Sequence, residues 1–196
     1  MRGMSPWVGY TVFVVGNVAG VAIRVPRDNR SKQVRVVDDR KGPLEVLLLA
    51  LMTLAILLPI LAMATSLLAF ADYPLRPASV AVGAISMGLY LWVFHRSHAD
   101  LGDNWSMTLQ LRESHHLVAT GIYRRVRHPM YAALYLLALA QALLVPNFVA
   151  GPAMLTAFTA MFFLRLGPEE QMMVDRFGDE YRAYAARTKR LIPGVW

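Results

Sequence analysis

Five apolar runs dominate the sequence, and they restrict the folds that the chain can adopt. The runs are 6–23, 44–71, 77–95, 129–145 and 147–164. A helix needs roughly 17–25 predominantly apolar residues to cross a bilayer. Hydrophobic residues make up 56% of the 196 residues and charged residues only 17%, so a soluble globule of this size would expose more apolar surface than its polar residues could cover. We therefore predict an all-α integral membrane protein with five transmembrane helices.

The individual runs differ in how well they fit one crossing. Run 44–71 is too long for a straight span and contains Pro59, so we predict a single tilted or kinked helix. Between the last two runs only Pro146 and Asn147 suggest a turn, which predicts a tight antiparallel hairpin. In the first run, Gly16 and Gly20 form a small-residue pair that lets another helix approach closely.

Lysine and arginine are distributed very unevenly over the connections between the runs. Segments 24–43, 96–128 and 165–196 hold seven, five and six of them, whereas the N-terminus and the 72–76 turn hold one each. Cytoplasmic segments of membrane proteins carry the excess of basic residues. We therefore predict that the N-terminus lies outside and that the two long loops and the C-terminal tail are cytoplasmic. The net charge of +7 could indicate binding to nucleic acid in a soluble protein. Here the basic residues cluster at the ends of apolar runs, which indicates membrane topology and contact with anionic lipid headgroups instead.

The predicted cytoplasmic segments together hold about eighty residues. That is too little for a conventional soluble catalytic domain such as a Rossmann fold, so any reaction must be carried out by short segments that lie against the membrane. The chain contains no cysteine, which excludes a disulfide framework, a thiolate metal site and a thiol nucleophile. The sequence carries no signal for a particular oligomeric state.

A dense cluster of basic and aromatic residues precedes the fourth run, in Gly121-Ile-Tyr-Arg-Arg-Val-Arg-His-Pro-Met-Tyr131. The residue before a proline avoids helical geometry, whereas proline suits the first helical turn, so we expect a helix to begin at about Pro129. Helix N-termini attract anions, and the three arginines of the cluster add positive charge. The segment is therefore a candidate site for a carboxylate or phosphate, with a positive-inside topology signal as the alternative.

The C-terminal tail extends the fifth run in a helical pattern. Arg165 and Glu169 are four residues apart and share one helix face, either as an ordinary ion pair or as a functional pair. Gly178 is a natural helix stop. Residues 179–184 then predict a short amphipathic helix.

Several short motifs in the second half of the chain occur together in a defined order. They are Leu101-Gly-Asp-Asn-Trp-Ser106, His115-His-Leu-Val118, Gly121-Ile-Tyr123, Arg127-His-Pro-Met-Tyr131, Arg165 followed by Glu169-Glu170, and Phe177-Gly-Asp-Glu-Tyr181. In order and spacing this set resembles the isoprenylcysteine carboxyl methyltransferase family, which also includes membrane phospholipid N-methyltransferases. The resemblance covers roughly residues 95–196.

The resemblance implies an S-adenosylmethionine-dependent methyltransferase whose cytoplasmic donor pocket is formed by the 96–128 loop and the C-terminal tail. A lipid-like or prenylated acceptor would enter from the bilayer, and no metal is required. The chain then divides into a three-helix membrane region, 1–95, and a catalytic region, 96–196. The donor-binding candidates that the resemblance implies are His115, Leu117, Val118, Gly121, Tyr123, Arg127, His128, Pro129, Tyr131, Glu169 and Glu170, and the catalytic candidates are Arg165 and Glu169.

These residue types suit a donor that carries a sulfonium, an amino acid head and a ribose. Glu169 or Glu170 can accept hydrogen bonds from the ammonium or the ribose hydroxyls, while Arg127 and His128 can bind the carboxylate. The two tyrosine rings of the 121–131 segment can face adenine or attract the sulfonium through a cation–π interaction. Interfacial tyrosines also serve as membrane anchors, which is the alternative explanation for them.

The residues leave alternatives open for the acceptor. A carboxylate, as in isoprenylcysteine, is already a nucleophile at neutral pH, and Arg165 could orient it. A phospholipid amine or a small thiol would have to lose a proton, for which Glu169 or a histidine is a candidate base. A sterol-type membrane reductase that binds NADPH and a non-catalytic membrane scaffold are the two competing classes of protein.

Overall fold

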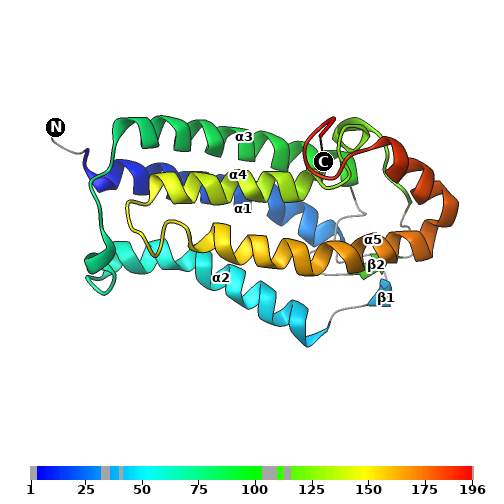
Figure 1. Cartoon of the computed structure of the whole chain (residues 1–196), viewed down its shortest axis with the longest axis horizontal. Helices are drawn as coiled ribbons and strands as arrows, with labels where there is room; N and C mark the ends of the chain where they lie inside the picture. The colour runs from blue at the N-terminus through cyan, green and yellow to red at the C-terminus, as the bar shows by residue number, and fades with distance from the viewer. Residues whose placement is uncertain (1–3, 32–35, 40–41, 103–109, 113–115, 196) are drawn as a thin grey trace.

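A bundle of five α-helices accounts for most of the computed structural model, which describes residues 4–31, 36–39, 42–102, 110–112 and 116–195 (Figure 1). Within these residues the helices are α1 (Pro6–Ser31), α2 (Pro43–Ala64), α3 (Pro77–Leu101), α4 (Pro129–Leu144) and α5 (Ala153–Arg187). Successive helices run in opposite directions along the bundle. α4 begins at Pro129 as predicted, because His128 before it has a non-helical backbone with φ −121° and ψ 59°.

Three of the helices have the length and composition of membrane spans. They are residues Pro6–Pro26 of α1 and the whole of α2 and α3, and many of their large apolar side chains face outward. α4 is apolar but shorter, with 16 residues. The prediction of a helical membrane protein is therefore confirmed, while length and composition identify three candidate spans instead of five.

A short antiparallel ribbon, which the sequence analysis did not predict, lies beside the bundle. β1 (Val36–Asp39) pairs with β2 (Gln110–Arg112), and Val36 lies opposite Arg112. β1 follows α1 and β2 follows α3, two helices that end at the same end of the bundle (Figure 1). The strands can pair only because the helices bring their ends together, and residue periodicity does not reveal such a contact.

α2 differs from its prediction at its C-terminal end. The helix contains Pro59 and ends at Ala64, because Thr65 has an extended backbone with φ −141° and ψ 162°. Ala69–Ala71 then forms a short 3-10 helix, η1. The apolar run 44–71 is therefore one helix followed by a turn, and not a single long helix.

Glycines on α1 allow this helix to pack closely against α3. A Cβ atom at Gly16 would collide with the side chain of Met87, and one at Gly20 would collide with the hydroxyl of Tyr90. Both partners belong to α3. The close helix approach predicted for this glycine pair is thus confirmed.

Asn147 joins two turns at the end of the bundle that carries the N-terminus. Its side-chain nitrogen donates hydrogen bonds to the carbonyl of Leu68 and to Asp72 Oδ1, both at 2.7 Å. Its side-chain oxygen accepts from the backbone N–H groups of Val149 and Ala150. The turn between α4 and α5 therefore lies against the turn between α2 and α3. α4 and α5 form an antiparallel hairpin as predicted, but residues 145–152 connect them, so the connection is longer than the predicted tight turn at Pro146 and Asn147.

Candidate functional site

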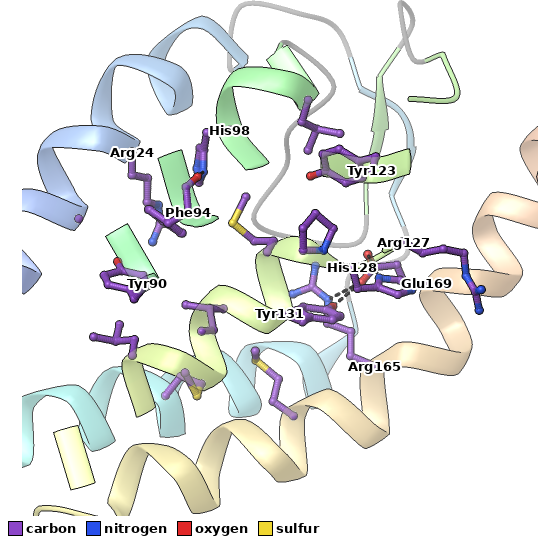
Figure 2. A pocket seen from close by; sticks show the side chains of 18 of the residues that line it. Arg24, Tyr90, Phe94, His98, Tyr123, Arg127, His128, Tyr131, Arg165 and Glu169 are labelled. Atoms are coloured by element: carbon purple, nitrogen blue, oxygen red, sulfur yellow. Dashed lines mark hydrogen bonds and ion pairs between the residues drawn. The ribbon is translucent and has the colours of Figure 1, made fainter. Parts of the chain in front are cut away.

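A cavity of about 450 Å³ lies between the helices and is lined by residues of all five of them and of the segment before α4. We call it the main cavity. Figure 2 shows Arg24, Tyr90, Phe94 and His98 along one wall and Tyr131, His128, Arg165 and Glu169 along another. Its apolar lining is rich in methionine, a flexible side chain that adapts to ligands of irregular shape. These methionines are Met52, Met130, Met154, Met161, Met172 and Met173.

Most of the site residues predicted from the sequence come together at this cavity. Those that line it are Val118, Tyr123, Arg127, His128, Pro129, Tyr131, Arg165 and Glu169. Leu117, Gly121 and Glu170 are not among the lining residues. His115 lies outside the residues that the structure describes.

Gly121 has a structural position in the turn that carries Tyr123 to the cavity. Gly121–Arg124 form the 3-10 helix η3. The backbone N–H of Ile122 donates a 2.8 Å hydrogen bond to Asp100 Oδ2 on α3. Gly121 has a φ of 58°, in the left-handed region that favours glycine, and a Cβ atom there would collide with the Asp100 carboxylate. Any side chain at this position would therefore push η3 away from α3.

Glu169 is the carboxylate that faces the main cavity. The hydroxyl of Tyr131 donates a hydrogen bond to it, His128 Nδ1 lies 3.7 Å from its Oε1, and Arg165 Nε lies 3.6 Å from its Oε2. Burial by itself would raise the pKa of the Glu169 carboxyl, but the contacts with His128, Arg165 and Tyr131 outweigh burial and lower this pKa to about 2. Glu169 is thus ionised at physiological pH, with 26% of its side chain exposed.

Glu170, the next residue, does not line the main cavity and contacts three basic side chains. Arg127 Nη2 and Arg190 Nη2 each lie 2.8 Å from its carboxylate, and His128 Nε2 lies 3.2 Å from its Oε1. Burial opposes ionisation, but these hydrogen bonds hold the pKa of Glu170 well below its ordinary value. Its carboxylate therefore fastens the segment before α4 and the C-terminal tail to α5.

The C-terminal tail folds back onto the cavity because α5 is interrupted at Gly178. This glycine has φ 54° and ψ −125° and divides α5 into two helical segments, as predicted from the sequence. Two residues that follow α5 accept backbone hydrogen bonds from the segment before α4. The N–H of Arg127 donates to the carbonyl of Lys189 at 2.7 Å, and the N–H of His128 donates to the carbonyl of Arg190 at 2.9 Å. The tail is thus held by backbone hydrogen bonds as well as by Glu170.

The side chains of the tail complete one wall of the main cavity. Tyr181 and Tyr184 both line it, and the Tyr184 hydroxyl donates a 2.6 Å hydrogen bond to the carbonyl of Tyr123. Burial raises the pKa of the Tyr181 hydroxyl to about 12. Both phenols are therefore neutral at physiological pH.

Arg165 contacts a second carboxylate that the sequence analysis did not include. Its Nη1 lies 3.4 Å from Glu45 Oε1, and the two side chains are 10% and 7% exposed. Glu45 lies in the first turn of α2, far from Arg165 in the sequence. One signal was available: Glu45 is the one acidic residue in an apolar helix, and such residues usually mark a buried pair or a functional site.

Other lining residues also come from segments that the motifs do not cover. Arg24 is on α1, while Tyr90, Phe94 and His98 form one face of α3 and lie in the opposite wall from Glu169 (Figure 2). Their spacing of four residues places the three α3 side chains on one face of the helix. That spacing alone cannot distinguish a cavity wall from an ordinary packed interface.

The fold and the site define a helical membrane protein whose cavity combines an ionised carboxylate, arginines and buried tyrosines with a methionine-rich apolar lining. Residues 81–175 match the model of the isoprenylcysteine carboxyl methyltransferase family. This match supports the family suspected from the motifs over this region of the chain. The matched region includes α4 and the Arg165 and Glu169 pair, but not α1, α2 or the tail.

The chain is also similar to individual enzymes whose reactions are known by name. A protein-S-isoprenylcysteine O-methyltransferase of Schizosaccharomyces pombe is 31% identical over 113 residues, which are 58% of this chain and 48% of that protein. One of Dictyostelium discoideum is 28% identical over 116 residues, 58% of this chain and 49% of that protein. Methanethiol S-methyltransferase 1 of Bradyrhizobium diazoefficiens is 38% identical over 73 residues, 37% of this chain and 24% of that protein. The chain thus spans about half the length of the isoprenylcysteine relatives or less.

The environment of His128 predicts how stability depends on pH. Burial by itself lowers the pKa of His128, but its contacts with Glu169 and Glu170 outweigh burial and raise this pKa above the ordinary value of 6.5. A raised folded-state pKa stabilises the protein fully below about pH 6.5, and the stabilisation is lost as the pH rises through the folded-state pKa. We therefore expect the protein to become less stable as the pH rises above about 6.5.

Thermal unfolding of the detergent-solubilised protein between pH 6 and pH 9 measures this effect. The melting temperature of the wild type should fall as the pH rises. In His128→Asn it should stay nearly constant, whereas in His95→Asn, a change at an exposed histidine, it should fall as in the wild type. An equally steep decline in His128→Asn would show that another group causes it.

Proposed function

We propose that the protein is an integral membrane methyltransferase that uses S-adenosylmethionine to methylate the carboxylate of an isoprenylcysteine-type acceptor. The observation that carries the proposal is the main cavity, where an ionised glutamate and three arginines meet an apolar, methionine-rich lining. The family match over residues 81–175 supplies the reaction class. The names of the isoprenylcysteine relatives support the choice of acceptor.

The residues around Glu169 fit such a methyl donor chemically. The ionised Glu169 carboxylate, about a quarter exposed, suits an ammonium group or ribose hydroxyls. Arg127 and His128 line the same cavity and suit a carboxylate. The rings of Tyr123 and Tyr181 offer apolar faces near them, which suit adenine or a sulfonium. When bound, S-adenosylmethionine would supply an activated methyl group.

The charges of the cavity favour an anionic acceptor over an amine. Arg24, Arg127 and Arg165 line the cavity, and Glu169 is the one carboxylate among its lining residues in the described chain. Such an excess of positive charge attracts a carboxylate and repels a protonated amine. The apolar lining between α1 and α2 suits the prenyl chain of such an acceptor.

Arg165 would orient the acceptor in this mechanism. A planar guanidinium binds a carboxylate through two parallel hydrogen bonds, which would direct one carboxylate oxygen toward the methyl group. No proton has to be removed, because a carboxylate is ionised at neutral pH. Alignment of the two reactants and exclusion of water by the folded-back tail would supply most of the acceleration.

We also propose that all five helices cross the membrane, with the main cavity at the cytoplasmic end. The hydrogen bonds of Asn147 support this, because they join the α4–α5 turn to the α2–α3 turn at one end of the bundle. Arg127 and His128, just before α4, meet the tail at the other end. Division of the chain into a membrane region, 1–95, and a catalytic region, 96–196, remains our working description.

Single cysteines introduced into this cysteine-free chain test the topology. Arg125→Cys and Glu180→Cys, at exposed positions, should react with a membrane-impermeant thiol reagent only after the cytoplasmic side is opened. Ser66→Cys, exposed in the α2–α3 turn, should react from outside. Labelling of all three from the same side would contradict the five-span arrangement.

Binding and turnover measurements test the reaction itself. The purified protein should bind S-adenosylmethionine and its demethylated product without added metal, and it should methylate a prenylated cysteine that has a free carboxylate. The same compound with its carboxylate converted to an amide is the matched control and should not be methylated. Binding of NADPH in place of S-adenosylmethionine would favour a reductase, and methylation of a small thiol alone would show that the acceptor is wrong.

Variants of Arg165 and Glu169 separate donor binding from acceptor alignment. Glu169→Gln should weaken donor affinity by roughly ten- to a hundredfold, because it removes a charge-assisted hydrogen bond of about 1.5–3 kcal/mol. Arg165→Lys keeps the positive charge beside the buried Glu45 but loses the planar fork. It should reduce turnover at least about tenfold and change donor affinity less than about threefold, as expected for an interaction used in the transition state.

Isothermal calorimetry and steady-state kinetics measure the two effects. We expect both variants to melt at a temperature close to that of the wild type. Equal losses of donor affinity and thermal stability in both variants would show that the pair only holds the tail in place.

A further inference from the structure

Glu45 is a buried carboxylate, and its burial by itself lowers the stability of the folded protein. It is 6% exposed, and it is the one charged residue in the sequence of α2. An ionised carboxylate in apolar surroundings needs a cationic partner and further hydrogen bonds to offset the loss of water. A leucine or methionine would fill the same space at lower cost, so packing alone does not explain a glutamate here.

The partner that explains Glu45 is Arg165, which contacts two carboxylates through different nitrogen atoms. Nη1 of Arg165 lies 3.4 Å from Glu45 Oε1, whereas Nε lies 3.6 Å from Glu169 Oε2. A guanidinium is planar and rigid, so contacts at two of its nitrogens restrict its orientation strongly. Glu169 lies on the same helix as Arg165, so Glu45 is the carboxylate that ties the guanidinium to a different helix.

Glu45 contacts Arg165 from outside the main cavity. A second, smaller cavity of about 170 Å³ lies between α2 and α5, and it is lined by Glu45, Arg165 and Pro168 among others. Arg165 also lines the main cavity, next to Tyr131 (Figure 2), but Glu45 does not. The guanidinium thus forms part of the wall between the two cavities, and Glu45 contacts it on the side away from the proposed reactants.

We propose that Glu45 is a positioning residue that fixes the guanidinium of Arg165 for the acceptor carboxylate. The Glu45 carboxylate holds Nη1 of Arg165, which keeps the guanidinium from rotating to pair with Glu169 alone. Glu169 then keeps its contacts with His128 and Tyr131. The inference rests on the proposed role of Arg165 in acceptor binding. It adds α2, which lies outside the family-matched residues 81–175, to the functional site.

The test compares two substitutions of Glu45 with a matched control. Glu45→Gln keeps the size of the side chain and removes its charge, Glu45→Asp keeps the charge, and Glu180→Gln makes the same change at an exposed position. Glu45→Gln should lower kcat/KM for the prenylated acceptor at least about tenfold, while the donor Kd changes less than about threefold. Glu45→Asp should recover part of the loss, and Glu180→Gln should behave as the wild type.

A double substitution tests whether Glu45 acts through Arg165. In the Arg165→Lys background, Glu45→Gln should lower kcat/KM by less than about twofold, because the guanidinium that it positions is already absent. Losses that multiply in the double variant would overturn the proposal. An unchanged kcat/KM in Glu45→Gln, or in Glu45→Asp and Glu45→Gln alike, would also overturn it and leave a purely structural ion pair.

Failure of the proposed function gives a different result from failure of this inference. A wild-type protein that binds S-adenosylmethionine but methylates no prenylated cysteine would contradict the proposed acceptor. In that case, thermal unfolding of Glu45→Gln, Arg165→Lys and the double variant measures the coupling between Glu45 and Arg165. Smaller melting-temperature losses in the double variant than the sum of the two single losses would support coupling, and strictly additive losses would contradict it.

Discussion

The structure depends on the pairing of carboxylates with basic side chains at one end of an apolar helix bundle. Water cannot satisfy these groups where the helices pack, so each buried carboxylate requires cationic and hydrogen-bonding partners from other segments. Glu170 thereby connects α5 to the segment before α4 and to the tail, and Arg165 connects α5 to α2. These ion pairs act together with apolar packing between α2 and α5 and with backbone hydrogen bonds between the tail and the segment before α4.

Two neighbouring glutamates make different contacts at this end of the bundle. Successive residues of a helix point about 100° apart, so Glu169 faces the main cavity while Glu170 faces the tail. His128 contacts both carboxylates with its two ring nitrogens, and it therefore links the closure of the tail to the geometry of the cavity. In the proposed mechanism, this imidazole is one of the groups through which a change in the tail would reach the donor site, together with Arg127.

The sequence predicts the parts of the structure that local backbone chemistry determines. The start of α4 at Pro129, the interruption at Gly178 and the shared face of Arg165 and Glu169 all follow from residue type and helical spacing. Contacts between distant segments do not follow from either. The contact between Glu45 and Arg165 and the pairing of β1 with β2 therefore required the structure. Glu170 does not line the main cavity, and its role as a donor ligand stays a prediction.

The division between matched and unmatched regions explains why the motifs alone leave the acceptor open. The residues around the proposed donor site, such as His128 and Glu169, lie within the family-matched region 81–175. Arg24 on α1 and Glu45 on α2 lie outside it, yet one lines the main cavity and the other contacts Arg165. Relatives that share the donor motifs can therefore differ in the charge and shape of the wall that would meet the acceptor, and differences of this kind are one way in which proteins discriminate between ligands.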